Sequence, residues 1–164
     1  EIGRSMNKQY SHHIVNLMPT NLYGPNDNFS ENESHVIPGL IHKMHAAKIN
    51  NEPSFKIWGS GTPLREFLFV DDLATAIEYL IKNNIDIDLL NVGSGEEVSI
   101  LELANQIKQV IGYTGEIELD SSKPDGNPRK LLDSSKINQL GWNAETSLTD
   151  GLKKTYSWYL ENLN

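Results

Sequence analysis

The sequence lacks cysteine, long apolar runs and concentrated positive charge. The absence of cysteine excludes a disulfide framework and a thiolate metal site, and it is typical of a protein of the reducing cytoplasm. No apolar run reaches the roughly 18 residues that a transmembrane helix needs, and the first residues carry no secretory signal. We therefore expect a globular cytoplasmic chain with no membrane partner.

The charge balance restricts the partners further. The 164 residues include 14 Lys and Arg against 22 Asp and Glu, for a formal net charge of −8, and the basic residues are scattered. Nucleic-acid binding normally needs a positive face, so we expect no nucleic-acid partner. The chain also lacks the His-Glu-x-x-His motif and any cluster with metal-ligand spacing, so we expect no metal. A small anionic ligand remains compatible, because it needs only two or three well-placed cations.

The first ten residues have the pattern of an incomplete helix. Ile2, Met6 and Tyr10 recur at helical spacing, but no capping residue precedes them. We interpret this stretch as the second half of a helix. We therefore expect the chain to be the C-terminal part of a longer protein.

Further along, short apolar runs alternate with segments of helical periodicity. The apolar runs predict strands at residues 13–18, 54–58, 88–92 and 116–120. Helices are predicted after each of the first three strands, and two more follow near Asp133 and over 148–163. The remaining segments 19–34 and 121–130 read as polar loops. This alternation is typical of an α/β fold with a partly parallel sheet.

Three helix starts carry capping signals. Ser99 and Glu102 have the spacing of a capping box, in which each side chain satisfies the other residue's backbone N–H. Ser34 is a candidate cap for the helix that follows the first loop. Asp71 or Asp72 is expected to cap the next helix, with both carboxylates turned into their own helix.

Two glycine pairs resemble nucleotide-binding loops but lack the full pattern. Gly59-x-Gly61 is followed by Pro63 and an apolar run rather than by a helix. Gly93-x-Gly95 lies between a strand and a helix but has no third glycine, which the dinucleotide fingerprint requires. On spacing alone, both pairs are turns.

Five segments carry a family resemblance when they are read in order. They are NLMPTNLYGP, SHVIPGLIHKMHAA, WGSGTPLREFLFVDDLA, NVGSGEEVSILELA and SSKPDGNPRKLLD. Together they closely resemble the C-terminal half of the GDP-L-fucose synthases, which belong to the extended short-chain dehydrogenase/reductase family. The resemblance covers nearly the whole chain, and the SHVIP, WGSGTPLREF and KPDGNPRK blocks are the most specific parts of it.

The resemblance implies a fold and an activity. It implies the C-terminal part of a Rossmann-type parallel sheet with a small α/β substrate-binding lobe. Residues 1–33 would end the NADP-binding domain, and residues 34–164 would form mainly the lobe, with segments returning to the sheet. The implied enzyme uses NADP(H) to epimerise GDP-4-keto-6-deoxy-D-mannose at C3 and C5 and to reduce C4, and it is a homodimer at full length. Two alternatives are another nucleotide-sugar epimerase or dehydratase and a non-catalytic GDP-sugar-binding fragment.

The resemblance also implies residues for the cofactor and for the acid/base step. Pro19, Thr20, Asn21 and Leu22 match the loop that touches the nicotinamide side of NADPH. His35 matches the histidine that acts as acid/base in epimerisation and lies beside the cofactor. The chemistry agrees, because protons next to a carbonyl must be removed and returned, and imidazole titrates in the useful range. Without the resemblance, these residues read as an ordinary turn and a surface or capping histidine.

A further set of residues matches the family's substrate contacts, namely Lys43, Trp58, Arg65, Asp125 and Lys130. A guanidinium such as that of Arg65 can pair with two oxygens of a diphosphate, and the Trp58 indole offers a flat wall. We hypothesise that Asp125 accepts both N–H groups of guanine. Lys130, with Arg129 beside it, is expected near the diphosphate. Taken singly, the loop charges read as a solvated surface, and Trp58 reads as a core residue.

Overall fold

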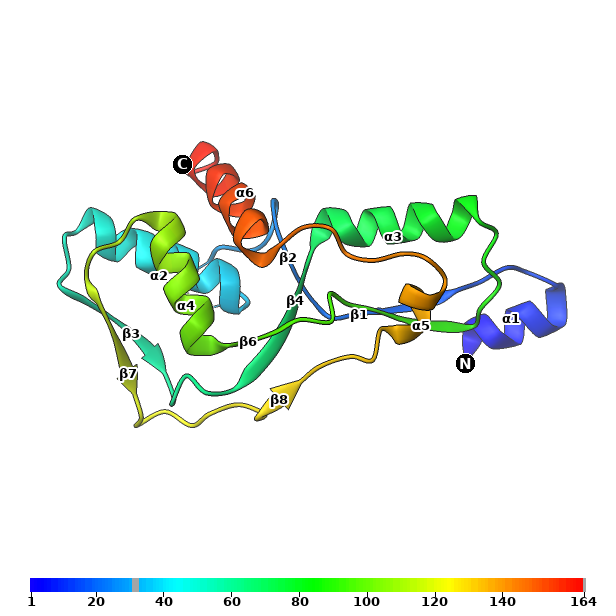
Figure 1. The fold of residues 1–164 in the computed structure, drawn as a ribbon, viewed down its shortest axis with the longest axis horizontal. Coiled ribbons are helices and arrows are strands. Elements are labelled where there is room, and N and C mark those ends of the chain that lie inside the picture. The colour runs from blue at the N-terminus through cyan, green and yellow to red at the C-terminus, as the bar shows by residue number, and fades with distance from the viewer. Residues whose placement is uncertain (31–32, 164) are drawn as a thin grey trace.

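A computed structural model describes residues 1–30 and 33–163 of the chain. The molecule is elongated, with helices and strands alternating along the sequence (Figure 1). The helices and strands are α1 (Ile2–Tyr10), β1 (Asn16–Pro19), β2 (Asn21–Tyr23), α2 (Val36–Ile49), β3 (Ser54–Trp58), β4 (Leu64–Phe69), α3 (Val70–Lys82), β5 (Leu89–Val92), β6 (Glu97–Ser99), α4 (Ile100–Ile111), β7 (Glu116–Asp120), β8 (Arg129–Lys130), α5 (Ser135–Gln139) and α6 (Leu148–Glu161). The predicted α/β class is confirmed.

The strands pair mostly in parallel and over long sequence separations. β1 pairs with β5, and β3 pairs with β7, each as a parallel pair. β4 lies between β2 and β6 and also pairs with β8, and among the strands of the described residues only the β4–β6 pairing is antiparallel. The predicted partly parallel sheet is therefore present, divided into three groups of strands.

One end of the molecule forms a lobe with its own core. We define the lobe as α2, β3, α4, β7 and α6, which lie together in Figure 1. Its buried side chains come from all of these elements except β7, together with residues of β2, β4 and β6. The predicted stripe of α2 supplies several of them: Ile37, Leu40, Ile41 and Met44. Burying a side chain of this size contributes about 1.5–3 kcal/mol.

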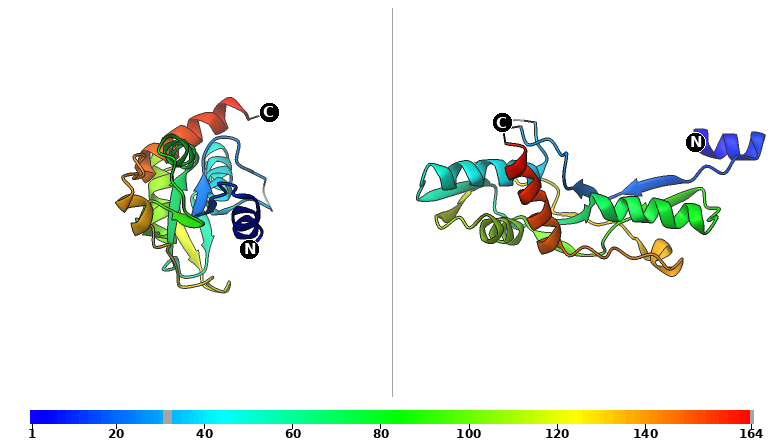
Figure 2. Two further views of the ribbon diagram at one scale, coloured as in Figure 1. Left: turned by 90° about the vertical axis from the view of Figure 1, so that its right-hand side faces the viewer. Right: turned by 90° about the horizontal axis from the view of Figure 1, so that it is seen from above.

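The other end forms what we call the β1–β5 layer, made of α1, β1, β5, α3 and α5. Its smaller core contains Leu90 and Val92 of β5, Ala76 and Leu80 of α3, and Trp142, which follows α5. Figure 2 shows α1 projecting at the far end of this layer, away from the lobe. The layer is therefore thinner than the lobe and buries fewer of its apolar side chains.

The strand β4 connects the two cores because side chains alternate along a strand. Phe67 and Phe69 point into the lobe core, whereas Leu68, between them, belongs to the core of the β1–β5 layer. All three side chains are buried. The sequence reading did not assign β4 as a strand, although it noted the apolar run there.

The capping predictions had mixed outcomes. Ser99 accepts a hydrogen bond from the Glu102 backbone N–H, and Glu102 accepts one from Ser99 in return, so the capping box is confirmed. Such a cap contributes about 1 kcal/mol. The Ser34 prediction was wrong, because His35 occupies the N-cap position of α2 and makes no side-chain cap hydrogen bond.

The prediction that Asp71 or Asp72 caps α3 was also wrong. Phe69 is the N-cap of that helix, and both aspartates lie inside its first turn. Asp72 is buried and accepts hydrogen bonds from the backbone N–H and the hydroxyl of Thr146. The carboxylate thus joins the segment before α6 to the start of α3, because the buried Asp72 side chain needs hydrogen-bond donors.

The loop predictions missed short strands. β2 lies inside the segment predicted as a loop at 19–34, and β8 lies inside the one predicted at 121–130. Residues 31–32 of the first segment lie outside the described residues. Both strands are stabilised by pairing with β4, a partner distant in sequence, so local sequence signals did not reveal them.

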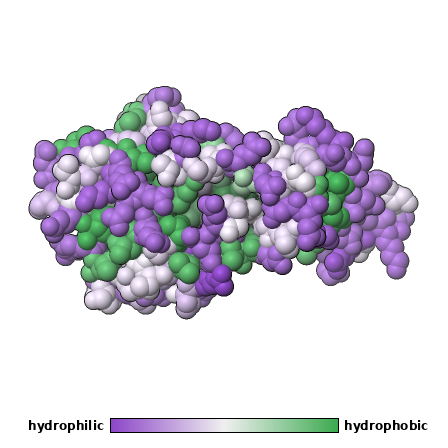
Figure 3. All heavy atoms as spheres, viewed as in Figure 1, coloured by the Kyte–Doolittle hydropathy of each residue, from purple (hydrophilic) through white to green (hydrophobic). Residues whose placement is uncertain are grey.

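Apolar side chains are also exposed on the β1–β5 layer. In the space-filling view, hydrophobic surface is visible toward the end of the molecule where α3 ends (Figure 3). Ile77 and Ile81 of α3 are 42% and 70% exposed, although their spacing with Leu73, Ala76 and Leu80 in the sequence predicts a shared apolar face. Among the described residues, no helix is both long and apolar enough to cross a membrane.

Candidate functional site

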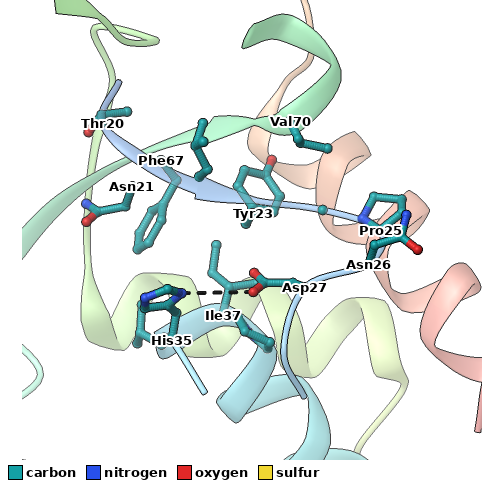
Figure 4. A pocket seen from close by; sticks show the side chains of 14 residues that line it. Thr20, Asn21, Tyr23, Pro25, Asn26, Asp27, His35, Ile37, Phe67 and Val70 are labelled. Atoms are coloured by element: carbon teal, nitrogen blue, oxygen red, sulfur yellow. Dashed lines mark ion pairs between the residues drawn. The ribbon is translucent and has the colours of Figure 1, made fainter. Parts of the chain in front are cut away.

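A pocket of about 500 Å³ opens between β2, the start of α2 and β4. Thr20, Asn21, Phe67 and Val70 line one side, and His35 lies on the opposite side (Figure 4). Three predicted cofactor residues, Thr20 to Leu22, therefore lie in one cavity with the predicted acid/base. Pro19, the fourth, ends β1 on an exposed position and does not line this pocket.

The backbone of β4 holds the polar residues on the first side of the pocket. The Thr20 hydroxyl and the Asn21 side-chain amide both donate to the carbonyl oxygen of Glu66, at 3.3 and 2.7 Å. The Thr20 backbone N–H donates to the carbonyl of Val92 at 3.0 Å. These hydrogen bonds fix the segment at the carboxyl end of β1, which is the edge where open α/β sheets bind ligands.

His35 is placed by the first turn of α2. Its backbone carbonyl accepts the N–H of Gly39, and its imidazole side chain is 84% exposed within the open pocket. The ring Nδ1 lies 3.9 Å from the Oδ1 of Asp27, whose side chain is mostly buried. Figure 4 shows the imidazole facing this carboxylate. Sequence reasoning missed Asp27, which lies in a polar loop without any distinguishing pattern.

A second group of predicted residues surrounds the turn after β3. Trp58 is 68% exposed, so it does not serve as a core residue. The ammonium groups of Lys43 and Lys123 lie 5.7 and 5.6 Å from the centre of its indole ring, within the range of cation–π contacts. Lys43 was predicted at this site, whereas Lys123 was not.

Asp125 is tied to the same turn. Its two carboxylate oxygens accept hydrogen bonds from the backbone N–H and the hydroxyl of Ser60, at 2.8 and 2.7 Å. Both hydrogen bonds hold the pKa of Asp125 below its usual value, so the carboxylate stays ionised. Gly59 is required here, since its φ is 79° and a Cβ would lie 2.2 Å from the carboxylate.

Arg65 lies on β4, and its side chain faces the 123–130 segment. Its guanidinium donates to the carbonyl of Leu64 at 2.8 Å, and a Cβ added to Gly126 would lie 3.1 Å from one of its nitrogens. The guanidinium therefore lies against the 123–130 segment. The register of β4 with β8 places Arg65 opposite Lys130.

The two basic residues of β8 have different surroundings. Lys130 donates from its ammonium group to the side-chain oxygen of Asn21 at 3.2 Å, which joins the second group of residues to the pocket. Arg129 makes a two-pronged ion pair with Glu97, at 2.6 to 3.0 Å, so its guanidinium is already engaged.

Glu66 is a functional candidate that the sequence reading missed. Its side chain is fully buried on β4, and its two carboxylate oxygens accept the backbone N–H groups of Gly95 and Leu132. Its carbonyl holds Thr20 and Asn21, as described above. A buried polar side chain needs such partners, and the available sequence signal was a single Glu inside the otherwise apolar run after Arg65.

Comparisons with known proteins bear on this arrangement. A sequence model described as the NAD dependent epimerase/dehydratase family matches residues 1–93. The chain belongs to the NAD dependent epimerase/dehydratase family. Membership of this family supports a nicotinamide cofactor.

Members of the epimerase/dehydratase family include relatives named for GDP-sugar chemistry. The chain is 52% identical over 155 residues to a probable GDP-L-fucose synthase 1 of Oryza sativa subsp. japonica, covering 94% of this chain and 47% of the relative. It is 48% identical to the GDP-L-fucose synthase of Escherichia coli strain K12, covering 99% of this chain and 53% of the relative. The chain thus spans about half the length of the curated relatives it matches.

A solved structure of the same family has the same fold. The GDP-L-fucose synthetase of Naegleria fowleri, bound to NADP, superposes with a TM-score of 0.88 at 32% identity. The superposition covers 98% of this chain and 52% of that one. The α/β fold expected from the sequence, with Rossmann-like parallel strand pairs, is therefore confirmed.

Proposed function

We propose that this chain provides the substrate-binding part of a GDP-L-fucose synthase. That enzyme would convert GDP-4-keto-6-deoxy-D-mannose to GDP-L-fucose by epimerisation at C3 and C5 and reduction at C4 with NADPH. In this proposal residues 1–33 end the NADP-binding domain, and residues 34–164 form mainly the substrate lobe. The full-length enzyme would act as a cytoplasmic homodimer.

The observation that carries the proposal is the connection between the pocket and the basic segment. His35 shares the pocket with Thr20 and Asn21, and Asn21 receives the hydrogen bond from Lys130. A nucleotide sugar held by the 123–130 segment would thus extend toward the imidazole. Relatives of this chain at 48–52% identity bear the name of this reaction.

The pocket fits the nicotinamide end of a cofactor in size and lining. Its volume of about 500 Å³ lies within the roughly 300–1,000 Å³ typical of small-molecule sites. Apolar side chains of Ile37, Phe67 and Val70 offer surface for a flat ring, and residues 20–22 with His35 would hold it. NADPH, when bound, supplies the hydride for C4.

The proposed chemistry of this chain centres on His35. Its imidazole would exchange a proton with a carbon next to the keto group on one face of the sugar, and inversion needs a second acid/base group on the opposite face. The Asp27 carboxylate, which faces Nδ1, would orient the ring so that Nε2 is directed at the substrate. The exposure of the ring is consistent with direct access of the sugar.

The remaining predicted residues would bind GDP. Arg65 and Lys130 would contact the diphosphate, and Trp58 and Lys43 would form one wall of the site. Asp125 would accept the two guanine N–H groups. The two hydrogen bonds from Ser60 occupy one acceptor position on each carboxylate oxygen of Asp125. Each of these oxygens can accept a second hydrogen bond.

The acid/base role of His35 is tested by measuring the deuterium exchange that the full-length protein catalyses. GDP-4-keto-6-deoxy-D-mannose is incubated in D2O, and deuterium at C3 and C5 is measured by mass spectrometry. We expect His35→Ala to lower exchange by roughly 100-fold or more, while the exposed His13→Ala control exchanges normally. Unchanged exchange in His35→Ala would overturn the role of His35.

The family assignment has a separate test. Turnover of GDP-4-keto-6-deoxy-D-mannose is compared with that of UDP- and dTDP-sugars, and preference for a UDP- or dTDP-sugar would contradict the proposal. We also expect the 164 residues alone not to oxidise NADPH, because their sequence has neither the third glycine of the dinucleotide fingerprint nor a Tyr-x-x-x-Lys pair. NADPH oxidation by the isolated chain would contradict this expectation.

A further inference from the structure

The surroundings of Trp58 are unusual for a chain of net charge −8. A large indole is exposed where β3 ends, and two ammonium groups lie beside it, from Lys43 on α2 and Lys123 in the turn after β7. An exposed indole offers a flat apolar surface with a polar N–H to a ligand. Two cations beside one ring repel each other, and an anion between them would relieve that repulsion.

The nearby acidic side chains are already engaged by other donors. Asp120 accepts the backbone N–H and the hydroxyl of Ser122, and Asp125 accepts the same two groups of Ser60. Glu118 pairs with Lys56 across β3 and β7 at 3.7 Å. Within residues 1–30 and 33–163, neither Lys43 nor Lys123 has a carboxylate partner. The positive charge at Trp58 is therefore available to a ligand.

The turn that carries Lys123 is well defined. The Lys123 backbone N–H donates to the carbonyl of Asp120 at 3.2 Å, and the register of β3 with β7 places Asp120 opposite Trp58. The backbone of the lysine is therefore held beside the indole by this hydrogen bond.

We propose that Lys123 is a further ligand-binding residue: beside the exposed ring of Trp58 and Lys43, it adds a positive charge to the phosphate group of the nucleoside diphosphate that Arg65 and Lys130 contact. This inference rests on the proposed function, since it concerns the same GDP-sugar site. It adds a residue and a role: Lys123 recognises the negative charge of the ligand and not its base. The site would consequently favour diphosphates over the neutral nucleoside.

The test compares GDP with guanosine in binding to the protein, followed by quenching of Trp58 fluorescence and by calorimetry. Loss of one charge-assisted contact corresponds to about tenfold in affinity. We expect Lys123→Gln to weaken GDP binding by about that factor, to leave guanosine binding unchanged, and to reduce the salt dependence of GDP binding. Lys123→Arg should restore most of the GDP affinity.

The matched control is Lys56→Gln, on the same strand as Trp58 but paired with Glu118, which should alter GDP affinity less than twofold. Equal GDP affinity in Lys123→Gln and the unaltered protein, or equal weakening for GDP and guanosine, would overturn the role of Lys123 alone. If the unaltered protein fails to bind GDP, or if Arg65→Ala binds it normally, the proposed function itself fails.

Discussion

The lobe and the β1–β5 layer differ in how completely they bury their apolar surface. In the lobe, α2 packs against β3 and α4, α4 packs against α6, and side chains such as Met44, Leu103 and Leu152 are fully buried. In the layer, α3 covers β1 and β5 from one side, and Ile77 and Ile81 remain exposed. The lobe therefore has a well-filled core, which β2, β4 and β6 complete, whereas the layer leaves apolar side chains of α3 uncovered.

The largest expected effect is on the core of each region. Leu103→Ala should destabilise the lobe by about 2–5 kcal/mol, because it leaves a cavity among fully buried neighbours. Tryptophan fluorescence can follow the unfolding of the two regions separately in denaturant. One variant retains only Trp158, which stacks on Phe29 beside the lobe, and the other retains only Trp142, in the core of the layer. The Trp158 midpoint should fall further than the Trp142 midpoint.

The matched variant in the layer is Leu90→Ala, for which the order of the two shifts should reverse. Equal shifts of both tryptophan signals in each variant would mean that the molecule unfolds as one cooperative unit. The distinction between the two regions would then be structural only and would have no thermodynamic counterpart.

A smaller effect is expected from the exposed face of α3. Ile81→Lys should reduce self-association of the protein at high concentration, because it places a charge on exposed apolar surface. Light scattering over a concentration series measures this. Ile49→Lys alters a similarly exposed isoleucine, at the end of α2 in the lobe, and should change the scattering less. The same reduction by both variants would contradict a special role of the layer.

The smallest effect concerns the pH dependence of the lobe. His45 Nδ1 lies 2.9 Å from the Tyr156 hydroxyl, and the ring packs edge-on against Tyr159. Burial, followed by the charges of Lys48 and His42, lowers the pKa of His45 below its ordinary value of 6.5. The unfolded chain therefore binds this proton more readily than the folded one.

It follows that the contribution of His45 to stability is complete above about pH 6.5 and declines as the pH falls below that value. His45→Gln should flatten this decline in the free energy of unfolding between pH 7.5 and 5.5. The control His12→Gln changes an exposed histidine near α1 and should leave the decline as it is. A decline that is equally steep in His45→Gln would show that another group causes it.

The elements that could be predicted from the sequence are those with local signals. The strand β3 has the bounds expected for it, and α4 begins at its capping box. Pro38 lies in the first turn of α2, where a proline is tolerated because it needs no backbone N–H partner there. The short strands β2, β6 and β8 could not be predicted, because each exists only through pairing with β4. Asp72 was misassigned for a related reason, since its hydrogen-bond partners lie more than seventy residues away.

The residues of the candidate site also differ in whether the sequence could indicate them. The family resemblance identified His35 and residues 20–22, and the structure brings them into one pocket. Asp27, Glu66 and Lys123 were missed, because a carboxylate or an ammonium group in a loop or strand has no periodicity that indicates its role. Their importance follows from contacts with residues that are distant in the sequence, and only the fold reveals those contacts.

The alternation of Phe67, Leu68 and Phe69 along β4 affects which misfolded arrangements of this strand the chain can adopt. A shift of one position in the pairing of this strand would turn both aromatic rings out of the lobe and bring Leu68 into it. Both cores would then be filled with side chains of the wrong size at once. Misregistered forms of this strand are thus penalised twice, which favours a single arrangement of the two regions.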